Sequence, residues 1–360
     1  MISRALLLLA GLAMGPGNAG GLRAQPRPRA DAVVALDGSG QFTSVQDAIN
    51  AAPMRTAATD PRWVIAIKPG IYRERVYVQR ERGNILLRGD DAVRTVITSN
   101  LHAGIPGPDG KPIGTFRTPT VQVDGDGFVA VNLTFANSAG PVGQALALRV
   151  DGDRVAFRKC RFLGWQDTVL VNRGRQVFED CYIEGDVDFV FGGATAFFDH
   201  CAIHCLRDGW IAAPSTPQGA AHGMVFADCR ITGAGGARTY LGRPWRNYAQ
   251  AAFLRTEMAS VVRPEGWHDW KKADAQRTVF FGEFASTGPG AEAGSRVPWA
   301  RQLTAAEASA LSMDRVIGGN DRWDPAAGFE AAAIGAGSPS EGSGAPHAGT
   351  GQSSGDLPGR

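Results

Sequence analysis

Two aspartates, Asp167 and Asp188, stand 21 residues apart in distinctive segments: Gly-Trp-Gln-Asp-Thr (164–168) and Val-Asp-Phe-Val-Phe-Gly-Gly (187–193). Two carboxyls that a fold brings close together do not ionise equally, and one retains its proton while the other remains an anion. A protonated carboxyl can act as a general acid, and a carboxylate can act as a nucleophile. The pair therefore predicts an enzyme site, although an aspartate beside a strand is often only a turn residue.

Two glutamines and an arginine add to this set. Gln144 and Gln166 are 22 residues apart, and their uncharged amides suit an oxyanion that develops at a carbonyl under attack. Arg243 and Trp245 lie in Leu-Gly-Arg-Pro-Trp (241–245), where a guanidinium can hold a carboxylate and an indole can stack on a sugar ring. Each residue alone is weak evidence. Their shared spacing favours one site on one face of the fold.

The 21-residue separation equals the period of an internal repeat. The motif Phe-x-x-Cys occurs four times, with steps of 21, 20 and 28 residues between the cysteines. The repeats contain Phe157, Phe178, Phe198 and Phe226, then Cys160, Cys181, Cys201 and Cys229, then Phe162, Ile183, Ile203 and Ile231. Apolar and polar residues alternate as in a strand, and no repeat has room for a crossover helix. The repeats predict an all-β solenoid, a single-stranded right-handed parallel β-helix with stacked phenylalanines and cysteines.

Other segments extend this solenoid. Residues 64–67, 85–87 and 129–135 are apolar and predict earlier coils, and a loop at about 213–221 accounts for the 28-residue step. In residues 44–52, Val45, Ala48, Ile49 and Ala52 share one helical face. Because the first coil of a solenoid exposes its core, we expect this short helix to cap the N-terminal end.

The two ends of the chain differ from the rest. Arg4 followed by an apolar run predicts a signal peptide and leader at 1–24, with cleavage near 19–24, although an uncleaved anchor is an alternative. Residues 335–360 are rich in Gly and Ser and predict a disordered tail. The catalytic β-helix domain is expected at 32–330. We expect a secreted or periplasmic protein that contacts no membrane after cleavage.

Composition narrows the possible partners and cofactors. A formal net charge of +2 gives no basic surplus for nucleic acid. His-Cys-x-x-His-Cys (200–205) could suggest zinc, but alternate residues of a strand point to opposite faces and no second cluster has the usual spacing. We therefore expect no metal and no cofactor. Stacked Cys181 and Cys201 either form a disulfide, which export permits, or remain buried thiols.

Five segments together resemble the signature segments of pectin methylesterases, and they occur in that family's order. They are residues 70–74 (Gly-Ile-Tyr-Arg-Glu), 144–148 (Gln-Ala-Leu-Ala-Leu), 164–168, 188–192 and 241–245. The resemblance extends from about residue 37 through 266–270 (Gly-Trp-His-Asp-Trp) to about 323. It implies a parallel β-helix that hydrolyses the methyl esters of galacturonate in pectin to pectate and methanol. The form resembles bacterial members, because no inhibitory domain is expected before the catalytic region. A solenoid enzyme of this size is expected to be a monomer.

The resemblance assigns roles residue by residue. Asp188 is implied as the nucleophile and Asp167 as the proton donor and later general base. Gln166 and Gln144 are implied as oxyanion donors, and Arg243 as the residue that orients Asp188. Implied substrate contacts are Thr115, Gln144, Arg243, Trp245, Trp165 and Phe189. Trp165 stands where tyrosine is more usual in the family, which leaves the preference for particular sugars open.

Three other functions compete with this interpretation. A β-helix pectate lyase needs clustered acidic calcium ligands, whereas the aspartates here are interleaved with glutamines. A catalytically silent carbohydrate-binding solenoid predicts loss of Asp167, Asp188 or Arg243, and all three are present. A serine hydrolase needs its Gly-x-Ser-x-Gly motif between a strand and a helix, and the only match, at 351–355, lies in the tail. A different esterified polymer as substrate also stays open.

Overall fold

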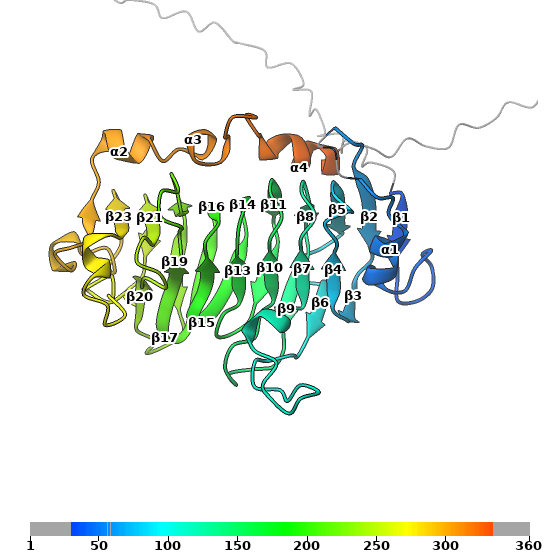
Figure 1. Cartoon of the computed structure of the whole chain (residues 1–360), viewed down its shortest axis with the longest axis horizontal. Helices are drawn as coiled ribbons and strands as arrows, with labels where there is room; N and C mark the ends of the chain where they lie inside the picture. The colour runs from blue at the N-terminus through cyan, green and yellow to red at the C-terminus, as the bar shows by residue number, and fades with distance from the viewer. Residues whose placement is uncertain (1–29, 56, 58, 334–360) are drawn as a thin grey trace, which may run out of the picture.

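The computed structural model describes residues 30–55, 57 and 59–333. The signal peptide predicted at 1–24 and the tail predicted at 335–360 lie outside these residues. Within them, short strands pair in parallel and stack as coils along the long axis of the molecule (Figure 1). The repeat therefore predicted the architecture correctly, because the molecule is a parallel β-helix.

The coils from β2 (Trp63–Ile67) to β20 (Thr239–Gly242) each contribute strands to three faces, and the last coils contribute fewer. The first face is an 11-stranded sheet in the order β1 (Ala32–Val34), β2 (Trp63–Ile67), β5 (Ile85–Gly89), β8 (Val129–Val131), β11 (Val155–Arg158), β14 (Arg175–Glu179), β16 (Thr195–Asp199), β18 (Met224–Ala227), β21 (Gln250–Leu254), β23 (Phe280–Phe284) and β24 (Arg301–Gln302). Within β11 and β14, Phe157 pairs with Phe178, which keeps the repeat in register.

The other two faces belong to one 13-stranded sheet. The second face contains β3 (Gly70–Arg73), β6 (Thr95–Ser99), β9 (Thr134–Asn137), β12 (Arg161–Leu163), β19 (Arg230–Gly233) and β22 (Glu257–Met258). The third contains β4 (Val76–Val78), β7 (Val121–Val123), β10 (Leu148–Val150), β13 (Val169–Val171) and β20 (Thr239–Gly242). Two long strands, β15 (Tyr182–Gly192) and β17 (Ala202–Pro214), pair with strands of both faces and join them.

Single residues in the left-handed backbone conformation make the corner between the first and second faces. Their φ angles lie near +53°, and in the four repeats they are Lys159, Asp180, His200 and Asp228. The treatment of residues 200–205 as one strand was therefore wrong at its first two residues, because the strand begins at Ala202. The four His and Cys side chains of this motif nevertheless do not converge on one point. Cys201 and Cys205 are buried in the core, His200 pairs with Asp199, and His204 contacts Thr232.

The predicted aromatic stack fills the core. Successive ring centroids of Phe157, Phe178, Phe198 and Phe226 are 4.8, 4.7 and 4.4 Å apart, and Phe253 continues the stack at 4.4 Å. All five cysteines are buried free thiols, so the Cys181–Cys201 disulfide is not formed in this structure. The Sγ atoms of the four repeat cysteines contact backbone carbonyls of the core, as that of Cys201 contacts Phe178 at 3.3 Å. The thiols thus act as small core residues.

Truncation of one ring in this stack is expected to destabilise the coil. Phe198 is completely buried between Phe178 and Phe226, so Phe198→Ala leaves a cavity and should cost about 3–5 kcal/mol of unfolding free energy. Urea denaturation followed by tryptophan fluorescence measures this loss. Val93→Ala, at a side chain 65% exposed, is the control and should change stability by less than about 0.5 kcal/mol. Equal effects of the two substitutions contradict the expectation.

The predicted N-terminal cap is present as α1 (Val45–Ala51), whose Val45, Ala48 and Ile49 are buried. Ser44 caps the helix by accepting a hydrogen bond from the backbone N–H of Asp47. Glu74 strengthens this end, since its carboxylate accepts from the backbone N–H groups of Val45 and Gln46 and from the Ser44 hydroxyl. Glu74, the last residue of the first signature segment, therefore stabilises the cap.

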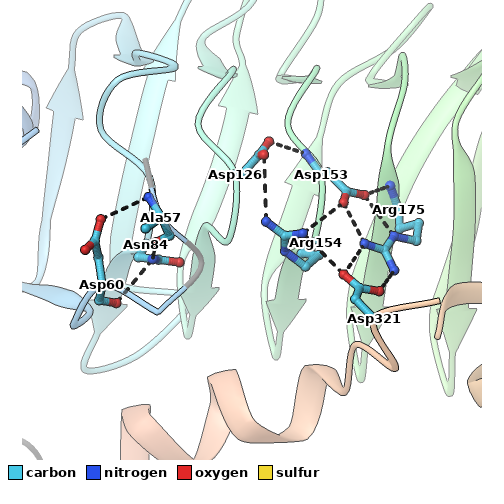
Figure 2. Close-up of polar contacts among 8 residues, drawn as sticks. All are labelled: Ala57, Asp60, Asn84, Asp126, Asp153, Arg154, Arg175 and Asp321. Atoms are coloured by element: carbon cyan, nitrogen blue, oxygen red, sulfur yellow. Dashed lines mark hydrogen bonds and ion pairs between the residues drawn. The ribbon is translucent and has the colours of Figure 1, made fainter. Parts of the chain in front are cut away.

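The C-terminal segment runs back along the first face (Figure 1) and carries α2 (Ala305–Ser309), α3 (Met313–Ile317) and α4 (Pro325–Ala333). Buried apolar clusters hold it, and Asp321 adds ion pairs to Arg175 and Arg154 (Figure 2). The Arg175 guanidinium also lies over the Trp323 ring, 5.7 Å from its centroid. No helix among the described residues is both long and apolar enough to cross a membrane.

Candidate active site

A pocket of about 260 Å³ opens on the third face. Its lining comprises Thr115, Phe116, Gln144, Gln166, Asp167, Asp188, Phe191, Ala213, Arg243, Trp245 and Trp270. The strands β10, β13, β15, β17 and β20 stack side by side here, so residues about one coil apart in sequence become neighbours. Seven residues predicted from the sequence thus meet in one pocket: Thr115, Gln144, Gln166, Asp167, Asp188, Arg243 and Trp245.

Local backbone irregularities aim the two aspartates. Asp188 lies where the register between β15 and β17 shifts, between Val187 and Val190, and its φ is +52°. Asp167 lies in the turn between β12 and β13 with a φ of +65°. Its backbone N–H donates to the carbonyl of Val187 at 3.0 Å, which ties the two corners together. Left-handed residues and bulges of this kind redirect side chains at functional sites.

Asp188 is held by a two-pronged ion pair. The Nε and Nη2 atoms of Arg243 each donate to one carboxylate oxygen of Asp188 at 2.7 Å. The side chains are only 8% and 13% exposed for Asp188 and Arg243, so water screens the pair little. Burial raises the pKa of Asp188, and the Arg243 guanidinium opposes that rise. The geometry keeps one carboxylate anionic and in fixed orientation.

Asp167 has no such partner. Burial and then the neighbouring charge of Asp188 hold the pKa of Asp167 well above its usual range, with a smaller contribution from Asp186. The guanidinium of Arg243 only partly offsets this rise. Of the two carboxyls, Asp167 thus has the environment that favours the protonated form, and Asp188, beside Arg243, has the one that favours the anion. Chemically, an arrangement of this kind can provide an acid and a nucleophile in one pocket.

Neutral amides and aromatic rings complete the pocket. Gln144 and Gln166 occupy successive coils, since the backbone N–H of Ala145 donates to the carbonyl of Gln166. Trp245 stacks on Phe116 at 6.4 Å and contacts Phe191 at 5.7 Å. The pocket thus combines uncharged donors beside the carboxyls with an aromatic wall, which suits a carbonyl compound attached to a sugar.

Two predicted substrate contacts are not part of the pocket. Phe189 was expected to touch substrate, but it has no exposed surface and packs in the core, because the left-handed residue before it turns its side chain inward. Phe191 lines the pocket in its place. Trp165 is not among the lining residues, and the Arg207 guanidinium lies over its ring at 4.8 Å.

Several residues of the site were missed from the sequence. Three aromatic residues of the pocket were not predicted, although each adjoins or lies in a segment identified from the sequence: Phe116, Phe191 and Trp270. Their position in or next to these segments could have indicated them. Asp186 was also missed: it is 2% exposed and accepts from Nε and Nη2 of Arg207 at 3.1 and 2.6 Å. It stands two residues before Asp188, but no motif marked Arg207 as its partner.

Known proteins share both this sequence and this fold. The pectinesterase family model matches residues 31–320. Pectinesterase 31 of Arabidopsis thaliana is 44% identical over 282 residues, or 76% of this chain and 88% of that protein. Several longer curated relatives match over only 52% to 63% of their length.

Two solved structures extend the comparison. Pectin methylesterase from carrot has a TM-score of 0.76 and 35% identity, covering 81% of this chain and 94% of that one. A pectin methylesterase in complex with hexasaccharide VII has a TM-score of 0.71 and 30% identity, covering 82% and 98%. By family model, sequence and fold, this chain belongs to the pectinesterase family of enzymes.

Proposed function

We propose that this protein hydrolyses the methyl esters of galacturonate in pectin, giving pectate and methanol, through a covalent intermediate on Asp188. The observation that carries the proposal is the unequal pair of carboxyls: Asp188 is fixed by Arg243, and Asp167 is buried beside it without a cation of its own. Such a pair provides a nucleophile and an acid within one ester-sized pocket. Membership of the pectinesterase family supports the choice of substrate.

In the first step, a carboxylate oxygen of Asp188 attacks the ester carbonyl carbon. Negative charge then develops on the carbonyl oxygen, and the amides of Gln144 and Gln166 donate to it. As the carbon–oxygen bond to the methoxy group breaks, Asp167 gives its proton to that oxygen and methanol leaves. The sugar carboxyl is now joined to Asp188 as an anhydride.

In the second step, Asp167 is a carboxylate and takes a proton from a water molecule. The resulting hydroxide equivalent attacks the carbonyl carbon of the sugar, and the bond to Asp188 breaks. Asp188 returns as a carboxylate beside Arg243, Asp167 is again protonated, and the sugar leaves as a carboxylic acid that gives its proton to the solvent and becomes galacturonate. Each proton that Asp167 gives to methanol is thus replaced from water, and the cycle draws only on residues of this chain.

The substrate is proposed to be polymeric and the protein to be a secreted monomer. The aromatic wall of Phe116, Trp245 and Trp270 fits pyranose rings, and a related enzyme has been solved with a hexasaccharide. Export is supported by the apolar run after Arg4. The bacterial type remains a proposal, because the named relatives, Pectinesterase 31 and the carrot enzyme, come from plants.

Methanol release from highly methylated pectin, measured with EDTA present, tests the function. We expect methanol release at the same rate with and without EDTA. Titration should show one new carboxylate for each methanol released. Appearance of unsaturated uronates only after calcium is restored indicates a lyase instead. Absence of both products, with the polymer still bound, indicates a carbohydrate-binding solenoid or a different ester.

A further inference from the structure

The guanidinium of Arg243 lies between two indole rings. Its Cζ is 3.5 Å from the ring centroid of Trp210 and 3.8 Å from that of Trp270. Trp270 lines the pocket, whereas Trp210 is not among the lining residues. A substrate in the pocket can therefore reach Trp270. Trp210 contacts Arg243 from a position outside the pocket lining.

Trp210 is itself fixed by its neighbours. It pairs in register with Val187 in β15 and with Tyr240 in β20, and the Tyr240 ring stacks on it with an interplanar angle of 12°. The edge of His268 packs against it at 5.6 Å. Its buried Nε1 has no hydrogen-bond partner within the described residues, so the indole acts through its face rather than through its N–H.

We propose that Trp210 is a positioning residue for the esterase reaction: it fixes the plane of Arg243 so that both prongs of the guanidinium remain on Asp188. An arginine side chain is long and flexible, and a two-pronged contact needs its guanidinium coplanar with the carboxylate. An aromatic face held in place restricts that plane, excludes water from one side and attracts the cation. This inference rests on the proposed function, in which Asp188 must be ionised and aligned for attack.

The consequence for titration has a definite sign. Arg243 lowers the pKa of Asp188, so a looser Arg243 lets that pKa rise. Attack needs the carboxylate, and the acid side of the pH profile of kcat/KM then moves to higher pH. The other charged or titratable groups around this pair and Trp210 are Asp167, Asp186, Arg207, Tyr240, Arg263, His268, Lys271 and Lys272. Of these, Tyr240 and His268 contact the Trp210 ring itself.

The test compares Trp210→Leu with Trp210→Phe on methylated pectin across pH. We expect the leucine variant to lose about 30-fold in kcat, the size of one desolvated cation–π contact, with KM little changed. The acid limb of its kcat/KM profile should move to higher pH. In the phenylalanine variant, both kcat and the position of this limb should be close to wild type. If Trp210→Leu does not fold, Trp210→Met, also apolar and without a ring, takes its place.

Trp323→Leu is the matched control. It removes an indole from another arginine–carboxylate contact, that of Arg175 with Asp321, on the first face (Figure 2). It should lower the melting temperature and leave the pH profile unchanged. An unmoved acid limb in Trp210→Leu, an effect confined to KM, or equal losses in the leucine and phenylalanine variants overturns the inference. Failure of wild type to release methanol overturns the proposed function instead.

Discussion

Asp188→Ala is expected to abolish methanol release, with kcat at least about 10⁴-fold below wild type. The substitution removes the atom that forms the covalent bond, and neither Asp167 nor the glutamines can replace it. It also leaves Arg243 buried between Trp210 and Trp270 without its anion, which should destabilise the fold. The loss must therefore be measured at a temperature at which circular dichroism shows the variant to be folded.

Asp208→Ala provides the matched control for this experiment. Asp208 lies on β17 and is also paired with an arginine, since Nη2 of Arg263 contacts it at 3.1 Å, but its side chain is 64% exposed. An exposed pair of this kind contributes little to stability, and its loss should leave methanol release unchanged. Activity of Asp188→Ala above about 1% of wild type contradicts a nucleophilic role, because nucleophile removal costs far more.

The sequence was sufficient to predict the solenoid and the pairing of the two aspartates, for one physical reason, whereas Thr115 came from the family resemblance and Arg243 and Trp245 from their motif. Side chains that stack between coils must recur at the length of a coil, so Phe157, Phe178, Phe198 and Phe226 reveal the period directly. Once the period is known, Asp167 and Asp188 must be neighbours. The repeat of stacked residues thus predicts from the sequence that the two aspartates lie close together.

The features that the sequence did not predict depend on the backbone angles of single residues and on side chains that belong to no recognisable motif. The corners are made by residues such as Lys159 and Asp180, which carry none of the glycine signal that usually marks a left-handed turn. The left-handed backbone at Asp188 also turns Phe189 into the core, whereas the family resemblance had implied Phe189 as a substrate contact. Trp210 meets Arg243 across the coil interface, and no repeat or motif includes it.

Asp167→Asn is expected to lower kcat on methyl esters by about 10²- to 10⁴-fold, because methoxide is a poor leaving group without a proton donor. The pH profile should change as well. In wild type, kcat/KM falls as pH rises through the raised pKa of Asp167, since the acid loses its proton. The asparagine has no proton to lose, so the variant's residual activity should not show that decline.

A 4-nitrophenyl ester of a galacturonate oligomer separates the two duties of Asp167. Its leaving group departs without protonation, so acylation in Asp167→Asn should approach the wild-type rate. Hydrolysis of the intermediate still lacks its general base, and 4-nitrophenolate should appear in a burst of one equivalent per enzyme. Mass spectrometry of the quenched protein should then locate the uronoyl group on Asp188. Equal losses for methyl and 4-nitrophenyl esters, with no burst, would mean that Asp167 neither protonates the leaving group nor activates water. The buried carboxyl of Asp167 would then only fill space in the pocket beside Asp188.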